Sequence, residues 1–195
     1  MGGIEKHHRP RGTHQRLAGK RTRCVDMKKR CIAIFLLGIF FFGHSVQIRA
    51  EAAASIENEI PEIIKKDCEE IGAEYDICPE LLEAIAYNES RFIEDVTNEN
   101  CWGLCQVNIK IHADRIEKYG YTEDDMLTAY PNIKIAADYL AELYATYGDD
   151  NPIVLSLYSG AGWAAVERYK EYGTMTKHVE NILTRSAAYE RLHDK

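Results

Sequence analysis

Apolar residues recur at helical spacing from residue 56 almost to the C-terminus, and no stretch keeps the period-two alternation of a strand for long. Prolines at first-turn positions and glycines at helix ends mark the expected boundaries. The expected helices are residues 56–71, one opened by Pro79, one opened by Pro131 and ended by Gly148, one with Asn151 as its cap and Pro152 in its first turn, residues 161–172 ended by Gly173, and residues 176–192. Residues 91–108 read as a loop. The sequence therefore predicts a single all-α domain.

A separate apolar segment, residues 31–43, precedes this region and reads CIAIFLLGIFFFG. A transmembrane helix needs about 20 apolar residues, whereas a signal-peptide core needs about 7 to 15. Three basic residues, 28–30, stand before the run, and Ala50-Glu51-Ala52 after it has the small-x-small form of a cleavage site. We expect residues 27–52 to be a signal peptide and the protein to be secreted to the cell envelope. The alternative is a short buried helix.

The segment before Met27 is polar and basic, and signal peptides seldom carry so long a leader. We therefore expect Met27 to be the true start, with residues 1–26 as a mis-called extension. Cys31 has no small-residue lipobox before it, so no lipid anchor and no stable membrane anchor are predicted.

Charge is unevenly distributed along the chain. The first 52 residues hold 11 of the 24 Lys and Arg residues but 3 of the 31 Asp and Glu residues, which leaves 13 basic and 28 acidic residues, a net charge of −15, in the remainder. A body this acidic repels a phosphate backbone, so no nucleic-acid partner is expected. It suits a neutral polymer such as a glycan.

Six cysteines become four after cleavage of the predicted signal peptide: Cys68, Cys78, Cys101 and Cys105. An even number in an exported protein predicts disulfides, and the sequence does not choose among the three pairings. A zinc site is the competing interpretation, but Cys101 and Cys105 are loosely spaced and the other two form no second close pair. No metal is predicted.

Glu89 is the candidate for acid chemistry. It lies four residues after Ile85 and seven after Leu82, which places it on the apolar face of its helix near the C-terminal end. Burial and the electronegative helix end both favour a protonated carboxyl, which can donate a proton to a glycosidic oxygen. The alternative is an exposed glutamate that pairs with Arg91.

Five segments, in order, resemble a known family: AIAYNESRF around Glu89, CWGLCQVN, PNIKIAADYLAELYATYGDD, VLSLYSGAGWAAV and KHVENIL. Together they are similar to the lytic transglycosylase domain of the soluble (SLT) type, related to goose-type lysozyme. The likeness covers roughly residues 70–190. It implies a single lysozyme-like helical catalytic domain at 70–195, preceded by an N-terminal helical segment at 53–69.

The resemblance assigns roles by position. Glu89 matches the family's single catalytic acid, and Ser90 matches the serine that helps to place the substrate and the acid. Gly103, Leu104 and Gln106 match three of the four residues of the second motif, where Gln106 would hydrogen-bond the sugar. These residues form the implied substrate site with two further positions described next.

Tyr158 matches the aromatic residue of the third motif, near the acid and the glycan. Three positions depart from the family pattern: Cys105 replaces a methionine, Ser159 replaces an asparagine, and His178 replaces a tyrosine that contacts the catalytic glutamate. A neutral His178 would still hydrogen-bond Glu89, whereas a protonated one would stabilise the carboxylate. The alternative for His178 is a surface position on the last helix.

Other aromatic and imidazole residues carry weaker signals. Trp102 would either stack on a sugar face or fill the core. Tyr139, Tyr144 and Tyr147 are assigned to helix packing, and His112 has no partner at ligand spacing.

The resemblance implies cleavage of the β-1,4 bond between N-acetylmuramic acid and N-acetylglucosamine in peptidoglycan, without water and without a metal or organic cofactor. The product would carry a 1,6-anhydro ring. Two alternatives stay open: a hydrolytic muramidase that uses Glu94, Asp95 or Glu99 as general base, and a glycan-binding or assembly protein that has lost turnover.

Overall fold

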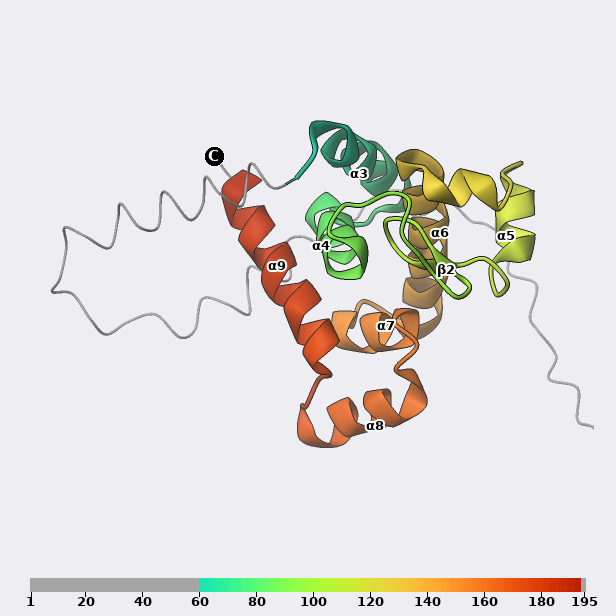
Figure 1. Cartoon of the computed structure of the whole chain (residues 1–195). Helices are drawn as coiled ribbons and strands as arrows, with labels where there is room; N and C mark the ends of the chain where they lie inside the picture. The colour runs from blue at the N-terminus through green and yellow to red at the C-terminus, as the bar shows by residue number, and fades with distance from the viewer. Residues whose placement is uncertain (1–59, 194–195) are drawn as a thin grey trace, which may run out of the picture.

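The computed structural model of this protein describes residues 60–193 (Figure 1). The predicted signal peptide, the Met27 start and the first residues of the N-terminal helical segment lie outside this range. Seven α-helices make up most of the described chain, which confirms the all-α prediction. They are α3 Glu62–Tyr75, α4 Pro79–Ser90, α5 Ala113–Lys118, α6 Ala129–Tyr147, α7 Asn151–Tyr158, α8 Gly162–Tyr172 and α9 Lys177–His193; a 3-10 helix, η2, spans Asp124–Leu127.

Most of the expected helix ends are correct. Pro79 opens α4 in its first turn, and Gly148 follows the last residue of α6. Gly173 ends α8 in the left-handed conformation, at φ 67°. Such positions favour glycine because it has no Cβ to clash. None of the described helices is both long and apolar enough to span a bilayer.

Three boundaries differ from the expectations. The first helix begins at Glu62 rather than at residue 56, and α6 begins at Ala129, two residues before Pro131. The N-cap of α7 is Asp150, whose Oδ1 accepts a hydrogen bond from the Ile153 amide at 3.4 Å, and not Asn151. Asn151 instead accepts a hydrogen bond from the Tyr144 hydroxyl at 2.6 Å.

A small antiparallel sheet occupies the segment that was predicted to be a loop. Its strands are β1 Thr97–Asn98, β2 Cys101–Trp102 and β3 Val107–Asn108, in the order β1-β2-β3. Cys101 pairs with Asn98 on one side and with Asn108 on the other. Two-residue strands are too short to show an alternating pattern, so the periodicity of the sequence could not reveal them.

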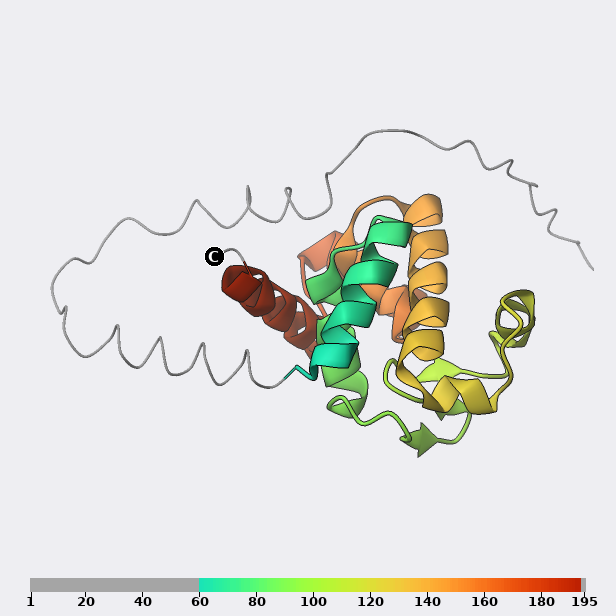
Figure 2. The same ribbon diagram turned by 90° about the horizontal axis from the view of Figure 1, so that it is seen from above.

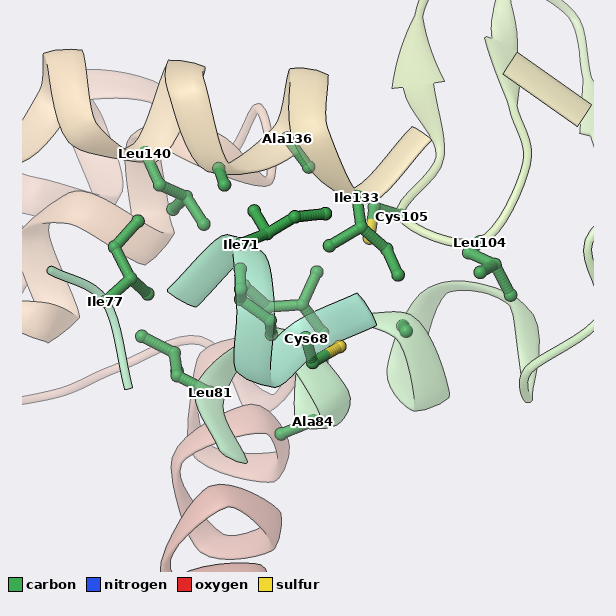
Figure 3. Packing of buried hydrophobic residues seen from close by; sticks show 14 of the residues in the cluster. Cys68, Ile71, Ile77, Leu81, Ala84, Leu104, Cys105, Ile133, Ala136 and Leu140 are labelled. Atoms are coloured by element: carbon green, nitrogen blue, oxygen red, sulfur yellow. The ribbon is translucent and has the colours of Figure 1, made fainter. Parts of the chain in front are cut away.

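The core lies where α3, α4 and α6 pack together, as Figure 2 shows from above. Their buried aliphatic side chains form one continuous cluster, part of which is drawn in Figure 3. Leu104, from the segment between β2 and β3, is fully buried in the same cluster. The core therefore fixes the sheet and its connecting loop against the ends of α4 and α6.

Helix α9 packs along α4 and its first part reaches α7 (Figure 1). The two helices are antiparallel, because the first turn of α9 meets the end of α4 and the last turn meets its beginning. The core face of α9 carries Val179, Ile182 and Tyr189, all fully buried.

No disulfide joins the four described cysteines, so the predicted disulfides are absent from this part of the chain. Cys68 and Cys105 belong to the hydrophobic core, where both appear in Figure 3. Burial raises the pKa of both thiols well above the ordinary value. They act as small apolar side chains, which the count of cysteines could not distinguish from disulfide partners.

Candidate active site

The Glu89 side chain lines a cleft of about 350 Å³ between the end of α4, the small sheet, α6 and the end of α7. Its side chain is 18% exposed. The lining residues are Glu89, Asn98, Cys101, Cys105, Gln106, Val107, Asn108, Ile111, His112, Ile135, Ala136, Tyr139, Leu157, Tyr158, Ser159 and Gly160. Three of the predicted site residues, Glu89, Gln106 and Tyr158, therefore meet in one cleft.

His178 contacts Glu89 from the first turn of α9. Its Nε2 lies 2.9 Å from Oε1 of Glu89, so His178 is not a surface histidine without a partner, although its side chain is 38% exposed. The hydrogen bond with Glu89 raises the pKa of His178 above 6.5, although burial acts in the opposite direction. The imidazole is thus held against the carboxylate of Glu89.

Glu89 is the only carboxylate among the described residues that line the cleft. The three acids that were considered as a second catalytic base lie elsewhere: Glu94, Asp95 and Glu99 are absent from the lining. Glu94 accepts a hydrogen bond at Oε2 from the Ala129 amide at 2.9 Å, at the beginning of α6. That carboxylate pairs with an amide at a helix N-terminus that has no acceptor within the helix, as an N-capping group does.

Asn132, which is fully buried, holds residues 103–106, the segment that carries the second motif. Its Nδ2 donates to the carbonyl oxygens of Trp102 at 2.8 Å and Met126 at 2.7 Å, and its Oδ1 accepts from the Cys105 amide at 2.8 Å. A Cβ on Gly103 would lie 2.0 Å from the Met126 carbonyl oxygen. Only glycine fits there, so Gly103 has a structural role beneath the cleft.

Like Gly103 and His178, two further predicted site residues are absent from the lining of the cleft. Leu104 is buried in the core, and Ser90 donates its hydroxyl to the Ala86 carbonyl at 3.0 Å. Ser90 is adjacent to Glu89, and its hydrogen bond lies within the last turn of α4. It therefore helps to fix the backbone that carries the acid.

Gln106 and Tyr158 line the cleft with their polar atoms partly engaged. The Gln106 Nε2 donates to the carbonyl oxygens of Val96 at 3.2 Å and Gly103 at 3.0 Å. The Tyr158 hydroxyl donates to the Cys105 carbonyl at 2.9 Å, and burial raises the pKa of the phenol. Gln106 thus joins two parts of the segment that contains the sheet, and Tyr158 ties that segment to α7.

Several cleft residues were missed by sequence reasoning. His112 and Tyr139 lie against each other with ring centroids 4.5 Å apart. Burial, followed by the positive charge of Arg115, lowers the pKa of His112 to about 4, so the imidazole is neutral at physiological pH. Asn98 and Asn108 add amide groups to the wall. Nothing in the sequence placed these residues, because they come from different elements that meet only in the fold.

The arrangement can supply one proton-donating carboxyl and several neutral hydrogen-bonding groups to a ligand with many hydroxyls.

Trp102 is half-buried against the core and donates its indole N–H to the Glu99 carbonyl at 3.3 Å, so it supports the sheet and is not part of the cleft lining. The described residues contain no group of three or more side chains placed to bind a metal ion.

Comparisons with known proteins agree with this geometry. Residues 68–182 match the family model described as the transglycosylase SLT domain. Protein IpgF of Shigella flexneri is 31% identical over 140 residues, which cover 68% of this chain and 83% of that protein. Protein IpgF of Shigella sonnei matches with the same identity and coverage. The chain belongs to the SLT transglycosylase family.

Proposed function

We propose that this protein is a peptidoglycan lytic transglycosylase that cleaves the β-1,4 bond between N-acetylmuramic acid and N-acetylglucosamine and leaves a 1,6-anhydro-muramic end. The observation that supports this proposal is that Glu89 is the only carboxylate among the described residues that line the cleft. Hydrolytic glycosidases usually place two carboxyl groups across the bond, one as acid and one as base or nucleophile. One acid suffices when the substrate supplies its own nucleophile.

The reaction begins with proton transfer from Glu89 to the glycosidic oxygen, and the bond from that oxygen to muramic C1 breaks. The N-acetyl group of the same sugar stabilises the positive charge at C1. Glu89, now a carboxylate, accepts the proton of the C6 hydroxyl while O6 bonds to C1 and closes the ring. The proton that Glu89 lost is regained, and no water is consumed.

The neighbouring residues have roles in this scheme that follow from their contacts. Gln106 and Tyr158 hold the floor of the cleft, and Gly103, Leu104 and Ser90 support it. Neutral His112 and the asparagine amides offer uncharged hydrogen bonds to sugar hydroxyls and acetamido groups. The protonation state of His178 sets the charge that lies next to the Glu89 carboxyl group.

Mass spectrometry of digested cell wall tests the proposal. Purified mature protein should release anhydro-muropeptides, and Glu89→Gln protein should release none above background. Reducing-end muropeptides would instead indicate a hydrolase. Binding to glycan strands without any product would indicate a non-catalytic glycan-binding protein. Circular dichroism of the Glu89→Gln protein provides the folding control.

We also propose that the chain is exported by the signal peptide at residues 27–52, with Met27 as the start and residues 70–195 as the catalytic domain. The acidic body and the cell-wall substrate both favour this location. N-terminal sequencing of the mature protein should find a new end shortly after Ala52. An end at Met1, or retention of the apolar run in exported protein, would contradict it.

A further inference from the structure

Two large aromatic side chains lie in contact on the surface beyond the Glu89 cleft. Tyr147 is the last residue of α6, and Trp163 lies in the first turn of α8. Their ring centroids are 5.4 Å apart and the ring planes meet at 77°, which is an edge-to-face contact. Trp163 is 51% exposed and Tyr147 is 38% exposed. We call these two residues the aromatic platform.

The aromatic platform lies close to two walls of the cleft. Gly160 lines the cleft, and Trp163 follows it by three residues, which span at most about 11 Å. Tyr139 also lines the cleft, and Tyr147 lies eight residues further along α6, a rise of about 12 Å. Helix α8 packs against α7, whose end forms part of the cleft, and lies beyond it in Figure 1. The platform therefore stands next to the cleft, outside its lining.

The platform has the properties of a contact surface for a ligand. A single exposed apolar side chain is common on proteins, whereas two in contact form an apolar patch, and such patches commonly mark binding sites. Tyrosine and tryptophan offer large, rigid contact areas at a low cost in conformational entropy. The Lys170 Nζ lies 6.0 Å from the Trp163 ring centroid and adds a hydrogen-bond donor beside the platform.

The proposed substrate is longer than the cleft. The cleft volume of about 350 Å³ is near the lower end of the range for pockets that hold one small ligand, about 300 to 1,000 Å³. A glycan strand is a polymer, so some of its sugars must lie over the surface outside the cleft. The faces of pyranose rings carry C–H groups, which pack against aromatic rings. The net charge of −15 after the predicted signal peptide disfavours an anionic lipid surface as the occupant.

We infer that the aromatic platform binds a sugar of the glycan strand where the strand extends out of the cleft, by stacking of the pyranose ring on Trp163. The inference rests on the proposed function, because that function places a β-1,4-linked glycan at Glu89. Contact at the platform adds to contact in the cleft, since the second contact of one strand is intramolecular. The protein therefore binds long strands more tightly than short ones.

Equilibrium binding to Glu89→Gln protein tests the inference without turnover. The probes are N-acetylglucosamine oligomers of two and six sugars, which have the β-1,4-linked pyranose backbone of the wall glycan without peptide and without charge. We expect Trp163→Ala to weaken binding of the six-sugar oligomer about fivefold to tenfold, the size of one aromatic contact. Binding of the two-sugar oligomer, which fits within the cleft, should change by less than about twofold in the same variant.

Further variants locate the effect on the platform. Trp163→Phe should keep part of the affinity for the six-sugar oligomer, because it keeps a smaller ring. Tyr147→Ala should weaken binding of the same oligomer by less than Trp163→Ala, because Tyr147 supports the Trp163 ring from its edge. The matched control is Tyr172→Ala, which removes a 69% exposed aromatic side chain from the same helix, about 14 Å along its axis from Trp163. It should leave both affinities unchanged.

Tryptophan fluorescence shows whether the oligomer touches the platform. The sequence contains two tryptophans, of which Trp102 is half-buried against the core. The six-sugar oligomer should protect Trp163 from quenching by acrylamide, and the two-sugar oligomer should not. Trp163→Phe protein retains the Trp102 signal and should show no protection that depends on oligomer length.

The inference would be overturned by unchanged affinity for the six-sugar oligomer in Trp163→Ala, or by failure of that oligomer to bind the Glu89→Gln protein. Equal losses for the two oligomers would also overturn it, because they would indicate a general effect on the cleft. A loss of the same size in Tyr172→Ala would assign the effect to the stability of α8. Failure of the proposed function is separate, because it appears as absence of anhydro-muropeptides from digests with wild-type protein.

Discussion

Two Glu–His pairs join the opposite ends of α4 and α9. At the cleft end, Glu89 Oε1 lies 2.9 Å from His178 Nε2; at the far end, Glu80 Oε1 lies 2.8 Å from His193 Nδ1. The cleft pair is more exposed, since the His178 side chain is 38% exposed and that of His193 is 17% exposed. The two pairs use the same residue types on the same two helices, so their surroundings account for their difference.

The glutamate of the far pair makes more than one side-chain hydrogen bond. Glu80 Oε2 also accepts from the Cys78 thiol at 2.9 Å. Burial alone would raise the pKa of Glu80, but hydrogen bonds from Cys78, its own amide and His193 outweigh burial and lower it. Among the described residues, Glu89 has no hydrogen bond besides that with His178, and it faces the cleft. The pair of Glu80 and His193 therefore holds the two helices together, and we call it the clamp. The pair of Glu89 and His178 leaves an acid that is accessible from the cleft.

The largest expected effect separates the two glutamates by activity. Glu89→Gln should lower the rate of cell-wall cleavage by at least about 100-fold, because an amide cannot donate an acidic proton and general acid catalysis contributes about 10²- to 10⁴-fold. Glu80→Gln, the matched change at the far pair, should keep the rate within about twofold. The measurement is release of soluble muropeptides by folded protein. Comparable losses in both variants would mean that the pair matters only for stability.

A third carboxyl on α4 lies between the pairs and sharpens the contrast. Glu83 is fully buried, and neither of its oxygens has a hydrogen-bond partner among the described residues. Burial, reinforced by the charge of Glu80, raises the pKa of Glu83 from 4.5 to about 8. A carboxyl whose folded pKa is raised stabilises the fold below its unfolded pKa, and that stability is lost as pH rises through the folded value.

We therefore expect Glu83→Met to change the pH dependence of folding. Wild-type stability should fall between pH 4.5 and 8 by an amount on the order of 5 kcal/mol relative to the variant, since each unit of the difference between the two pKa values corresponds to about 1.4 kcal/mol. Methionine has a similar volume and does not titrate. Urea unfolding at pH 5 and pH 8 measures the difference between the two proteins. Parallel stability profiles would show that Glu83 is not buried as an acid.

Much of the fold followed from the sequence, because helical periodicity and the prolines and glycines at helix ends act locally. Pro79, Gly148 and Gly173 marked boundaries correctly because each fixes the backbone conformation of its own turn. Asp150 was missed as a cap because its neighbour Asn151 is also a capping residue type. The cysteine prediction failed because a count does not distinguish a buried thiol from a disulfide partner.

The candidate site was only partly visible in the sequence. The place of Glu89 on an apolar helix face made it a candidate, with an exposed glutamate as the alternative. The resemblance then favoured Glu89 and added Gln106 and Tyr158. His112 could not be found, since its neutral state depends on burial and on Arg115 in the folded chain. The buried Asn132 lies in the helix segment that carries part of the resemblance, but two of its three hydrogen bonds reach Trp102 and Cys105, which are 30 and 27 residues away.

The pH dependence of activity tests the pair of Glu89 and His178 at the cleft end. Protonated His178 stabilises the carboxylate form of Glu89, which has no proton to donate. Because hydrogen bonding with Glu89 raises the pKa of His178 above 6.5, the charge develops at a higher pH than for a free histidine. Activity should therefore be held down wherever His178 carries a charge, and His178→Tyr should raise the rate at pH 6 several-fold. At pH 9, where fewer His178 side chains are protonated, the ratio of the two rates should be smaller.

The control for this experiment is His193→Tyr, which alters the far pair and should leave the rate at both pH values unchanged. Thermal unfolding at each pH separates loss of folding from loss of activity. An unchanged profile in His178→Tyr would mean that His178 does not control the charge state of Glu89, despite their 2.9 Å contact.

The smallest effect is expected from breaking the clamp alone. His193→Ala removes one partner of a pair whose side chains are 17% and 14% exposed. Such a pair lies between exposed ion pairs, worth about 0 to 1 kcal/mol, and buried charged hydrogen bonds, worth about 1.5 to 3 kcal/mol. We expect a loss of about 1 kcal/mol, seen as a fall in Tm of about 3 to 5 °C at pH 6. Because the pKa of Glu80 is lowered in the fold, its contribution should be present above pH 4.5 and lost as pH falls through the folded value. An equal fall in Tm at pH 6 and pH 3 would contradict an ionic clamp and assign the loss to packing at the end of α9.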